Sequence, residues 1–494
     1  MNDMTPGHIA HPDRFYIGGE WVEPSGSTKF DVITPSTEEL FVSVAEAQTA
    51  DVDKAVAAAR HAFDKGPWPR MSHAERASYI ARFADHIQDG APGMARAWAS
   101  EMGIVAPFAE LMMGSVADTY RFYAGLADTF EWEERHPAKS AEVALLVREP
   151  VGVVGAIIPW NGPPILIAWK IAPALLAGCT VVLKASPEAP SAAYAVAEIA
   201  EKIGLPPGVL NVITADREVS EALVRHPGVD KITFTGSSAA GKRVASICGE
   251  RIARCTLELG GKSAAVVLED IDAATVAQAM AQNASFMTGQ VCAALTRLVV
   301  PRSRYDELAD ALSAAFRDIR VGDPLQQGTQ MGPLAMSRQR DRVEHYLQVG
   351  RAEGAQVIVG GGRPAEMERG YFIEPTVFTN VDPRATIAQE EIFGPVVSMI
   401  AADSEEHAID IANDTVFGLS GSVFTNDPER AYRVARQMRA GTVGHNGATG
   451  DFFSIAFGGF KQSGIGREGG VEGLKPFLEA KTILLHGAPA HLKG

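Results

Sequence analysis

Short β-branched runs alternate with longer Ala-rich amphipathic segments between about Val151 and Val267. The runs include VGVVGAII, TVVLKA, GVLNVIT and KITFTG, and the segments include PILIAWKIAPALLAG, SAAYAVAEIAEKIG and REVSEALVRH. Buried strands read as nearly continuous apolar runs, whereas helices repeat apolar residues every three or four positions. The alternation therefore predicts a parallel sheet with helices on both faces, which binds ligands beyond the carboxyl ends of its strands.

A second alternating series runs from AAVVLED to about Ala456 and includes TRLVVP, QVIVGG, FIEPTVF, VVSMIA and SGSVFTN. It predicts a second α/β domain. Ahead of both series, the region from about Val52 to Trp132 shows apolar residues at helical spacing. AEVALLVREP and KTILLH are strand-like runs outside both series. We expect them to pair with each other or across subunits, because uncovered strand edges favour association.

Composition limits the class of protein. The chain has 494 residues, 46% hydrophobic and 21% charged, which is enough for two or three globular units. No apolar stretch is long enough to cross a bilayer, and the polar start MNDMTPGHIAHPDR lacks the features of a secretory signal. A net charge of −15 argues against nucleic acid. We therefore expect a cytoplasmic protein that binds neither membrane nor nucleic acid.

The four cysteines differ in their sequence surroundings. They are too few for a disulfide framework, and no CxxC pair suggests a metal site. Cys292 follows Gly289 in a polar loop, where a thiol can be exposed and ionised as a nucleophile must be. Cys179 has apolar neighbours and is expected in the core, and Cys248 and Cys255 are expected to be structural. A structural role for Cys292 is the alternative at this point.

Two polar residues occur where catalysis needs them. Glu258 ends a strand-like run ahead of two glycines, where burial can raise the pKa of a general base. Asn161, in PWNGPP, is held by prolines that can fix its amide as an oxyanion donor. The alternatives are a solvated strand-end carboxylate and an ordinary proline turn.

The segment KITFTGSSAAGKRVA reads as a strand that ends at Gly236, followed by a small polar turn and a helix opened by Gly241. Glycine lets a pyrophosphate approach the backbone at a helix N-terminus, where unpaired N–H groups favour negative charge. A tight turn that packs the helix on the strand is the alternative, because the spacing is not GxGxxG.

Several segments occur in a specific order along the chain: PWN at 159–161, LELGGK at 257–262, GQVC at 289–292, EEIFGPV at 390–396 and FGGFKQSGIGRE at 457–468. Together they resemble the aldehyde dehydrogenase superfamily over nearly the whole chain. The resemblance implies an α/β fold with a Rossmann-like cofactor domain, an α/β catalytic domain and a small β element for oligomerisation. The expected bounds are 13–127 and 149–261 for the dinucleotide-binding domain, 262–470 for the catalytic domain, and 128–148 and 476–494 for the oligomerisation strands.

The resemblance implies oxidation of an aldehyde to a carboxylic acid with NAD(P)+ and water, through a thiohemiacetal and a thioester on a cysteine. By this resemblance Cys292 is the nucleophile and Glu258 is the general base. The Asn161 amide and the Cys292 backbone N–H form the oxyanion hole. Lys170 and Glu468 match family positions that pass protons away from the base. Dimers or tetramers are the expected assemblies.

The same resemblance assigns the cofactor site. Ile158, Trp160 and Lys184 lie along the adenosine side, Gly236 and Ser237 at the pyrophosphate, Leu259 at the nicotinamide amide, and Glu391 and Phe393 at the nicotinamide ribose. Where relatives read Lys-Pro-Ser-Glu, this chain has Lys184-Ala185-Ser186-Pro187, with Glu188 one place late. Arg217 favours a 2′-phosphate whereas Asp216 opposes it. We therefore expect NAD, with NADP as the alternative.

The expected substrate pocket contains Gly162, Trp169, Val291, Ala293 and Phe457. Gly162 stands where many relatives carry an aromatic ring, which suggests a bulkier or branched apolar aldehyde. The segment HNGATGDFF is also unusual for the family and is expected at the tunnel mouth.

Three other functions remain open from the sequence. A coenzyme A-acylating dehydrogenase often lacks the general base, so Glu258 argues against it. A non-catalytic ligand-binding relative conflicts with the presence of Cys292, Glu258 and Asn161 together. A cysteine hydrolase without a cofactor needs a histidine partner, and no local His-Cys signature is present.

Overall fold

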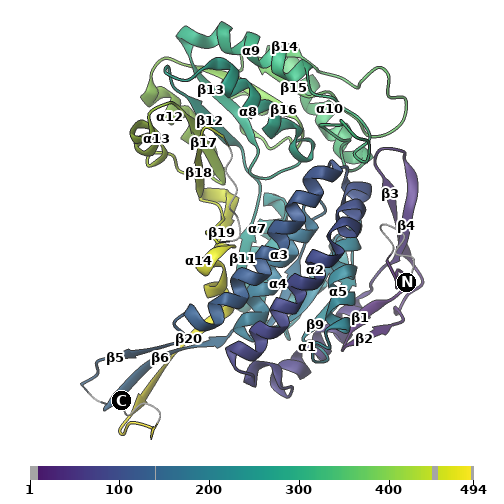
Figure 1. Ribbon diagram of the computed structural model, residues 1–494, viewed down its shortest axis with the longest axis vertical. Coiled ribbons are helices and arrows are strands. Elements are labelled where there is room, and N and C mark those ends of the chain that lie inside the picture. The colour runs from purple at the N-terminus through teal and green to yellow at the C-terminus, as the bar shows by residue number, and fades with distance from the viewer. Residues whose placement is uncertain (1–8, 140, 448–453, 491–494) are drawn as a thin grey trace.

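Two sheets with parallel cores form the centre of the molecule in the computed structural model, which describes residues 9–139, 141–447 and 454–490 (Figure 1). In the first sheet, antiparallel strands flank a parallel core. Its strands in spatial order are β19 (Gly464–Ile465), β11 (Arg254–Glu258), β10 (Lys231–Thr235), β7 (Val153–Ile157), β8 (Thr180–Ala185), β9 (Leu210–Thr214), β1 (Phe15–Ile17) and β2 (Glu20–Val22).

Helices cover both faces of this sheet, as the alternating pattern predicts. Successive residues of a strand point to opposite faces, so Val153 and Val154 of β7 enter different apolar clusters. One face packs against α1 (Thr49–Asp64), α6 (Arg217–Arg225) and α7 (Ser238–Arg251). The other face packs against α2 (His73–Met102), α3 (Ala106–Thr129), α4 (Pro163–Ala177) and α5 (Ser191–Lys202).

The second sheet confirms the expected second α/β domain. It is parallel except for β14 at its edge. Its strands in order are β14 (Gln356–Val359), β15 (Thr376–Thr379), β16 (Val396–Ala402), β13 (Leu295–Pro301), β12 (Ser263–Val267), β17 (Ser420–Phe424) and β18 (Thr442–His445).

Helices again cover both faces of the second sheet. One face packs against α8 (Ala273–Ser285) and α9 (Tyr305–Arg317). The other packs against α10 (Ser337–Ala352), α11 (Thr386–Gln389), α12 (Glu405–Asn413) and α13 (Pro428–Ala435). Shorter helices are α14 (Gly470–Leu474) and the 3₁₀ turns Trp68–Arg70, Phe286–Gly289, Arg302–Arg304, Lys461–Ser463 and Lys475–Phe477.

A small antiparallel sheet projects from the body beside the first sheet (Figure 1). It contains β5 (Glu133–His136), β6 (Val143–Pro150) and β20 (Leu478–Leu485). The two strand-like runs noted in the sequence pair with each other within one chain, from Leu478 opposite Pro150 to Leu485 opposite Val143. The strand β5, which is short and largely exposed, lies within the range 128–148 expected for the oligomerisation strands, although no apolar run marks it.

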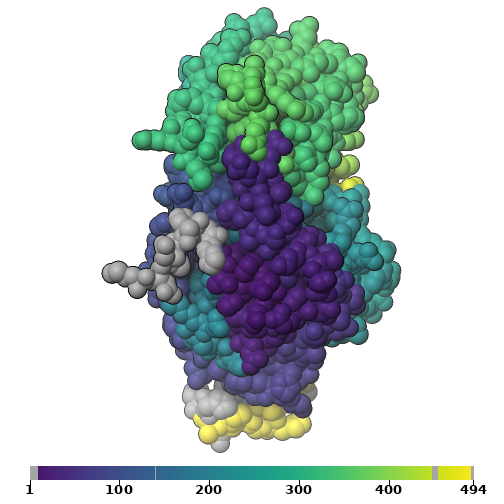
Figure 2. All heavy atoms as spheres, turned by 90° about the vertical axis from the view of Figure 1, so that its right-hand side faces the viewer, coloured from purple at the N-terminus to yellow at the C-terminus, as the bar shows by residue number. Residues whose placement is uncertain are grey.

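The N-terminal segment joins the two domains. Its hairpin of β3 (Lys29–Thr34) and β4 (Glu39–Ala45) was not predicted, nor were β1 and β2. In Figure 2 this segment lies along the first domain and reaches the second domain with its tip. There the Tyr371 N–H donates to the Pro35 carbonyl at 2.9 Å, and the Gly370 N–H donates to Glu38 Oε1 at 2.8 Å.

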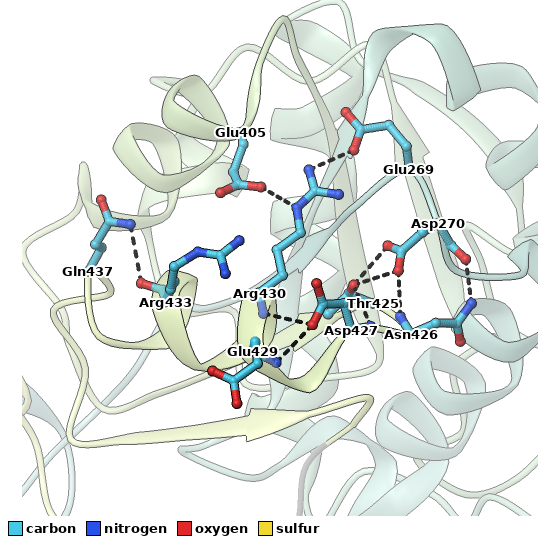
Figure 3. A network of polar contacts seen from close by, with 10 residues as sticks. All are labelled: Glu269, Asp270, Glu405, Thr425, Asn426, Asp427, Glu429, Arg430, Arg433 and Gln437. Carbon is cyan, nitrogen blue, oxygen red and sulfur yellow. Dashed lines mark hydrogen bonds and ion pairs between the residues drawn. The ribbon is translucent and has the colours of Figure 1, made fainter.

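Polar side chains follow the carboxyl ends of strands in the second sheet (Figure 3). Asp270, after β12, accepts hydrogen bonds from the Thr425 hydroxyl and the Asn426 N–H, each at 2.8 Å. Arg430 of α13 bridges Glu405 at 2.6 Å and Glu269 at 2.9 Å. These contacts join the loops after β12, β16 and β17.

No helix within the described ranges is both long and apolar enough to cross a bilayer. Residues 448–453 of the unusual HNGATGDFF segment lie outside the described residues, as do residues 491–494 of the predicted oligomerisation strands.

Candidate active site

A cavity of about 370 Å³ lies where the carboxyl ends of β10 and β11 meet the loops that precede β13 and β16. Most of the residues singled out in the sequence line it: Asn161, Glu258, Cys292, Trp160, Gly236, Ser237, Leu259, Glu391, Phe393, Gly162, Trp169, Val291, Ala293 and Phe457. Lys170, Glu468, Ile158 and Lys184 do not line it. The first two lie behind its wall, and the last two lie at the ends of β7 and β8.

The loop before Cys292 has a constrained backbone. Thr288 adopts φ of 55° and Gly289 adopts φ of 67°, and a Cβ on Gly289 would overlap the Gly394 carbonyl. Gln290 anchors the loop, because its side chain donates to the Met287 carbonyl at 3.0 Å and accepts from the Ala335 N–H at 2.9 Å. The loop therefore presents Cys292 to the cavity from a fixed position.

The Cys292 thiol differs from the sequence expectation that it is exposed and ionised. The residue is only half-buried, yet burial of the thiol, together with the carboxylates of Glu391 and Glu258, raises its pKa to about 12. The neighbouring Ala293 and Cys292 N–H groups oppose that rise. Ionisation of this thiol therefore needs a proton acceptor or added positive charge inside the cavity.

Asn161 lies just before α4, which begins with two prolines. Its side-chain Nδ2 donates to the Gln290 carbonyl at 3.0 Å, and its own carbonyl accepts from Trp98 Nε1 at 3.0 Å. A primary amide has two N–H donors, so the bond to Gln290 orients the group and leaves its second donor for the cavity. The proline turn and an oxyanion role are therefore compatible.

Glu258 is the last residue of β11, and its side chain is 2% exposed. Neither carboxylate oxygen has a hydrogen-bond partner among the described residues. Burial raises the pKa of Glu258 well above its usual value, and the nearby negative charge of Glu468 raises it further. A buried, unpaired carboxylate facing a cavity has the properties of a general base, and a solvated strand-end charge does not fit this burial.

Lys170 and Glu468 form an ion pair behind Glu258, and both side chains are buried. Lys170 Nζ also donates to Thr235 Oγ1 at 2.7 Å, and Glu468 accepts from Thr233 Oγ1 at 3.1 Å. The positive charge of Lys170 lowers the pKa of Glu258 and so opposes the effect of Glu468. The pair therefore sets the charge that the candidate base experiences.

The helix that follows the glycine-bearing turn after β10 begins earlier than predicted. Helix α7 begins at Ser238, with Ser237 as its N-cap, because the Ser237 hydroxyl accepts from the Ala240 N–H at 3.3 Å. Gly241 therefore lies inside the first turn and does not open the helix. A Cβ on Gly241 would overlap Leu259, so close packing of helix on strand also explains this glycine.

Lys184 is buried at the end of β8, and its carbonyl accepts from the Ile158 N–H at 3.1 Å. Burial lowers the pKa of Lys184 to about 8, although the carboxylates of Glu188 and Asp216 oppose this shift. Glu188 in turn accepts from Ser186 and forms an ion pair with Arg338 of α10. The edge of the sheet around Lys184 is therefore rich in carboxylates.

Asp216 and Arg217 have different positions at the start of α6. Asp216 caps α6, accepting from the Val219 N–H at 3.0 Å, whereas Arg217 is exposed as the first residue of that helix.

The nicotinamide side expected from the sequence has the Glu391 carboxylate and the Phe393 ring, which contacts Trp160 of the expected adenosine side. Glu391 accepts from the Gly261 N–H at 3.1 Å, and burial raises the pKa of Glu391 to about 7. The rings of Trp160 and Phe393 meet edge to face, with centroids 5.5 Å apart. Phe393 adopts φ of 63°, a left-handed conformation that a bulky residue rarely takes.

The remaining walls of the cavity are apolar. Trp169 and Phe457 lie with ring centroids 5.2 Å apart. A Cβ on Gly162 would meet Ile165 and Leu166 at an ordinary 3.7 Å, so this position has room for a side chain. Sequence reasoning missed several apolar lining residues, for which helical periodicity was the only signal: Trp98, Met112, Ile165, Leu166, Phe286 and Met287.

Comparison with known proteins adds to this geometry. The chain matches the aldehyde dehydrogenase family over residues 21–483. It is 43% identical over 485 residues to a geranial dehydrogenase of Castellaniella defragrans, covering 98% of this chain and 100% of the relative. It is 42% identical over 477 residues to a 3-succinoylsemialdehyde-pyridine dehydrogenase of a Pseudomonas species, covering 95% and 98% of the two chains.

Solved structures give the same result. A Mycobacterium tuberculosis aldehyde dehydrogenase complexed with NAD+ superposes with a TM-score of 0.93 at 46% identity, covering 96% of this chain and 98% of the other. A mutant aldehyde dehydrogenase C of Pseudomonas syringae, complexed with NAD+ and octanal, gives a TM-score of 0.93 at 40% identity, covering 97% and 98%. The chain therefore belongs to the aldehyde dehydrogenase family.

Proposed function

We propose that the chain is an NAD+-dependent aldehyde dehydrogenase that oxidises an apolar aldehyde to its carboxylic acid through a thioester on Cys292. The observation that supports this most strongly is a single cavity lined by the Cys292 thiol, the Asn161 amide and the unpaired, buried Glu258 carboxylate. Nucleophile, oxyanion donor and base are the three groups that acyl chemistry on a cysteine requires.

In this mechanism a water molecule in the cavity accepts the thiol proton, and the Cys292 sulfur forms a bond to the aldehyde carbon. The Asn161 amide and the Cys292 backbone N–H stabilise the oxyanion of the thiohemiacetal. NAD+, when bound, supplies the hydride acceptor for oxidation to the thioester. Glu258 then takes a proton from the water that attacks the thioester carbonyl, and the acid leaves with Cys292 restored. Lys170 and Glu468 carry that proton away from Glu258.

The described residues fit a dinucleotide at the carboxyl edge of the first sheet. A side chain is excluded at Gly236, because a Cβ there would lie 2.6 Å from the Phe234 ring. The start of α7 offers N–H groups to a pyrophosphate at Gly236 and Ser237, and Leu259 would lie at the nicotinamide amide. Lys184 and Ile158 would hold the adenosine ribose, and Glu391 and Phe393 the nicotinamide ribose.

We prefer NAD+ over NADP+ because carboxylates surround Lys184. Asp216 and Glu188 both act on the Lys184 ammonium, and Arg338 is already paired with Glu188. A 2′-phosphate placed there meets negative charge, and exposed Arg217 is its one evident counter-charge on α6. Two solved relatives are described as complexes with NAD+, which agrees with this preference.

The substrate class follows from the apolar walls. Among the described residues lining the cavity, the charged ones are Glu258, Glu391 and Arg342. The two carboxylates have proposed roles with water and with the cofactor, and Arg342 donates to the backbone carbonyls of Glu391 and Ile392. A cationic aldehyde therefore finds no dedicated counter-ion, whereas the space beside Gly162 accepts a branched or bulky chain. The geranial and octanal named for two relatives belong to this apolar class.

We also propose an oligomeric assembly, a cytoplasmic location and bounds for the domains. The projecting sheet of β5, β6 and β20 has open edges and supports a dimer or tetramer. The acidic composition supports a cytoplasmic location. The three sheets support division into 13–127 with 149–261, 262–470, and 128–148 with 476–494. However, β19, at 464–465, pairs with β11 of the first sheet.

A panel of branched, linear, aromatic and cationic aldehydes, each assayed with NAD+ and NADP+ for formation of reduced cofactor, tests the proposal. We expect turnover with NAD+ and the highest kcat/KM for apolar aldehydes. Turnover that requires coenzyme A would favour the acylating alternative, and absence of turnover with every aldehyde would favour a non-catalytic relative. Release of product without reduced cofactor would favour a cysteine hydrolase.

A further inference from the structure

Two cysteines outside the active site lie against each other where α7 ends and β11 begins. Cys248 is in the last turn of α7, and Cys255 is the second residue of β11. Ile252 adopts a left-handed φ of 54° as the helix C-cap, and the Ala253 N–H donates to the Cys248 carbonyl at 2.9 Å. This tight reversal places the two thiols beside each other in the apolar cluster between α7 and the sheet, where each shifts the pKa of the other.

The two thiols differ in exposure. Cys248 is 1% exposed in the apolar cluster between α7 and the sheet, whereas Cys255 is half-buried at the margin of that cluster. In the described part of the chain, β19 pairs only with Leu257 and Glu258, so the first half of β11 is an open sheet edge. A small solute therefore reaches Cys255 first.

The surrounding charges favour a thiolate on Cys255. The neighbouring Cys248 thiol lowers the pKa of Cys255 to about 7, and the buried Lys231 ammonium also lowers it against the opposing effect of burial. Lys231 Nζ is held nearby by its bond to Thr256 Oγ1 at 2.7 Å. The pKa of Cys248 is raised, because its thiol lies beside Cys255 and is buried. By contrast, burial raises the pKa of Cys179 to about 11.

We propose that Cys248 and Cys255 are a modification site, a thiol pair that a hydroperoxide converts to a reversible disulfide independently of Cys292. The juxtaposition of one accessible thiol with one buried resolving thiol is the arrangement that such chemistry requires. Neither residue lines the active-site cavity.

The reaction balances in two steps. The Cys255 thiolate attacks one peroxide oxygen, so an S–O bond forms, the O–O bond breaks, and the other oxygen leaves as an alcohol after taking a proton. Cys255 is thereby oxidised to a sulfenic acid while the hydroperoxide is reduced. The Cys248 sulfur, on losing its proton, then attacks the Cys255 sulfur, the S–O bond breaks, and hydroxide leaves as water.

Peptide mapping tests this pair without any dehydrogenase assay, so its outcome is separate from that of the proposed function. Trypsin places the four cysteines in different peptides, at 171–184, 244–251, 255–262 and 263–297. The full chain is treated with hydrogen peroxide at neutral pH, blocked with an alkylating reagent and digested without reductant. We expect peptides 244–251 and 255–262 joined by a disulfide, which dithiothreitol reverses, and 171–184 alkylated as the internal control.

Single variants assign the two steps. In Cys248→Ala we expect the Cys255 sulfenic acid to persist and to be captured by a dione probe. In Cys255→Ala, oxidation of Cys248 should be slower by about tenfold or more, because a buried thiol of raised pKa reacts poorly. Recovery of both peptides in alkylated form from the treated wild-type chain would overturn the proposal. Cys255 oxidised to a sulfinic acid beside a free Cys248 would also overturn it. So would capture of Cys179 by the dione probe at the same rate as Cys255.

Discussion

The two parallel sheets face the active-site cavity with opposite edges. The first sheet faces it with the carboxyl ends of its strands, and the second sheet faces it with the amino ends. The first sheet contributes residues at the carboxyl ends of its strands, such as Glu258 at the end of β11 and Gly236 after β10. The second sheet contributes loops that precede its strands, with Cys292 before β13 and Glu391 before β16. The carboxyl edge of the second sheet instead holds the ion-pair network around Arg430 (Figure 3).

This difference shows that the general rule for where ligands bind to open α/β sheets does not hold for both sheets of this protein. Ligands bind beyond the carboxyl ends of parallel strands because loops and helix N-termini converge there. The rule describes the first sheet. For the second sheet the rule points to the wrong edge, because the short segment after β11 leads directly into β12 and places the amino edge of the second sheet over the carboxyl edge of the first. The predictions below test the two edges separately.

Cys292→Ala should have the largest effect. Loss of the thiol at the amino edge of the second sheet removes the covalent step, so turnover should fall by about 10⁴-fold or more. NAD+ affinity, measured by quenching of tryptophan fluorescence, should stay within about twofold, because the sulfur supplies covalent chemistry and not dinucleotide contacts. Cys179→Ala is the matched control and should retain turnover. Appreciable turnover by Cys292→Ala would remove this residue from the mechanism.

Glu258→Gln tests the carboxyl edge of the first sheet. The isosteric amide cannot accept a proton, so steady-state turnover should fall by about 10²-fold or more. One equivalent of NADH per active site should still appear in a rapid burst, and mass spectrometry should find the acyl group on peptide 263–297. Loss of the burst would instead assign Glu258 to deprotonation of the Cys292 thiol.

The pH dependence of deacylation should follow the raised pKa of Glu258. The base is active when deprotonated, so the rate should fall as pH falls through that raised pKa, which the negative charge of Glu468 helps to raise. In Glu468→Gln this acidic limb of the pH–rate profile should therefore move to lower pH. Thr233→Val removes a hydrogen bond to Glu468 without changing charge and should leave the limb in place. A limb that moves upward in Glu468→Gln would contradict the charge argument.

Gly162→Phe should change selectivity more than overall rate. A Cβ at Gly162 would meet Ile165 and Leu166 at an ordinary contact distance of 3.7 Å, and the backbone φ of −133° allows any residue. We expect kcat/KM for a branched apolar aldehyde to fall by about tenfold relative to a linear aldehyde of the same carbon number. Gly162→Ala should show a smaller change in the same direction. Equal losses for both aldehydes would place the substrate elsewhere in the cavity.

The sequence predicted the parallel parts of the fold better than the antiparallel parts. Strands such as β8 and β10 are buried along their whole length, so they appear as continuous apolar runs. The strands β2 and β5 have only three and four residues, none of them buried, so no apolar run marks them. Their existence depends on pairing with other segments, which local pattern does not contain.

For the site, motifs predicted which residues converge but not all of their properties. The raised pKa of Glu258 follows from a strand-end position with burial, and it was anticipated. The ionised Cys292 was a wrong expectation, because burial raises the pKa of the thiol and the Glu391 carboxylate, from a loop about one hundred residues away in sequence, adds to that rise. Likewise Trp98 and Met112 line the cavity only because α2 and α3 pack beside α4.

Arg430→Met should have the smallest effect. It directly tests the carboxyl edge of the second sheet, which lies away from the active-site cavity. Arg430 bridges Glu405 and Glu269, but these side chains are about a quarter to a half exposed, so solvent screens the ion pairs. The free energy of unfolding should fall by about 1 kcal/mol or less, seen as a small decrease in Tm. Turnover and both KM values should stay within about twofold, because none of the residues in this network lines the active-site cavity.

Asp270→Asn, which keeps the shape of a second member of the network, should behave in the same way. A tenfold loss of turnover in either variant, with Tm little changed, would show that the carboxyl edge of the second sheet takes part in catalysis and would remove the contrast between the two sheets.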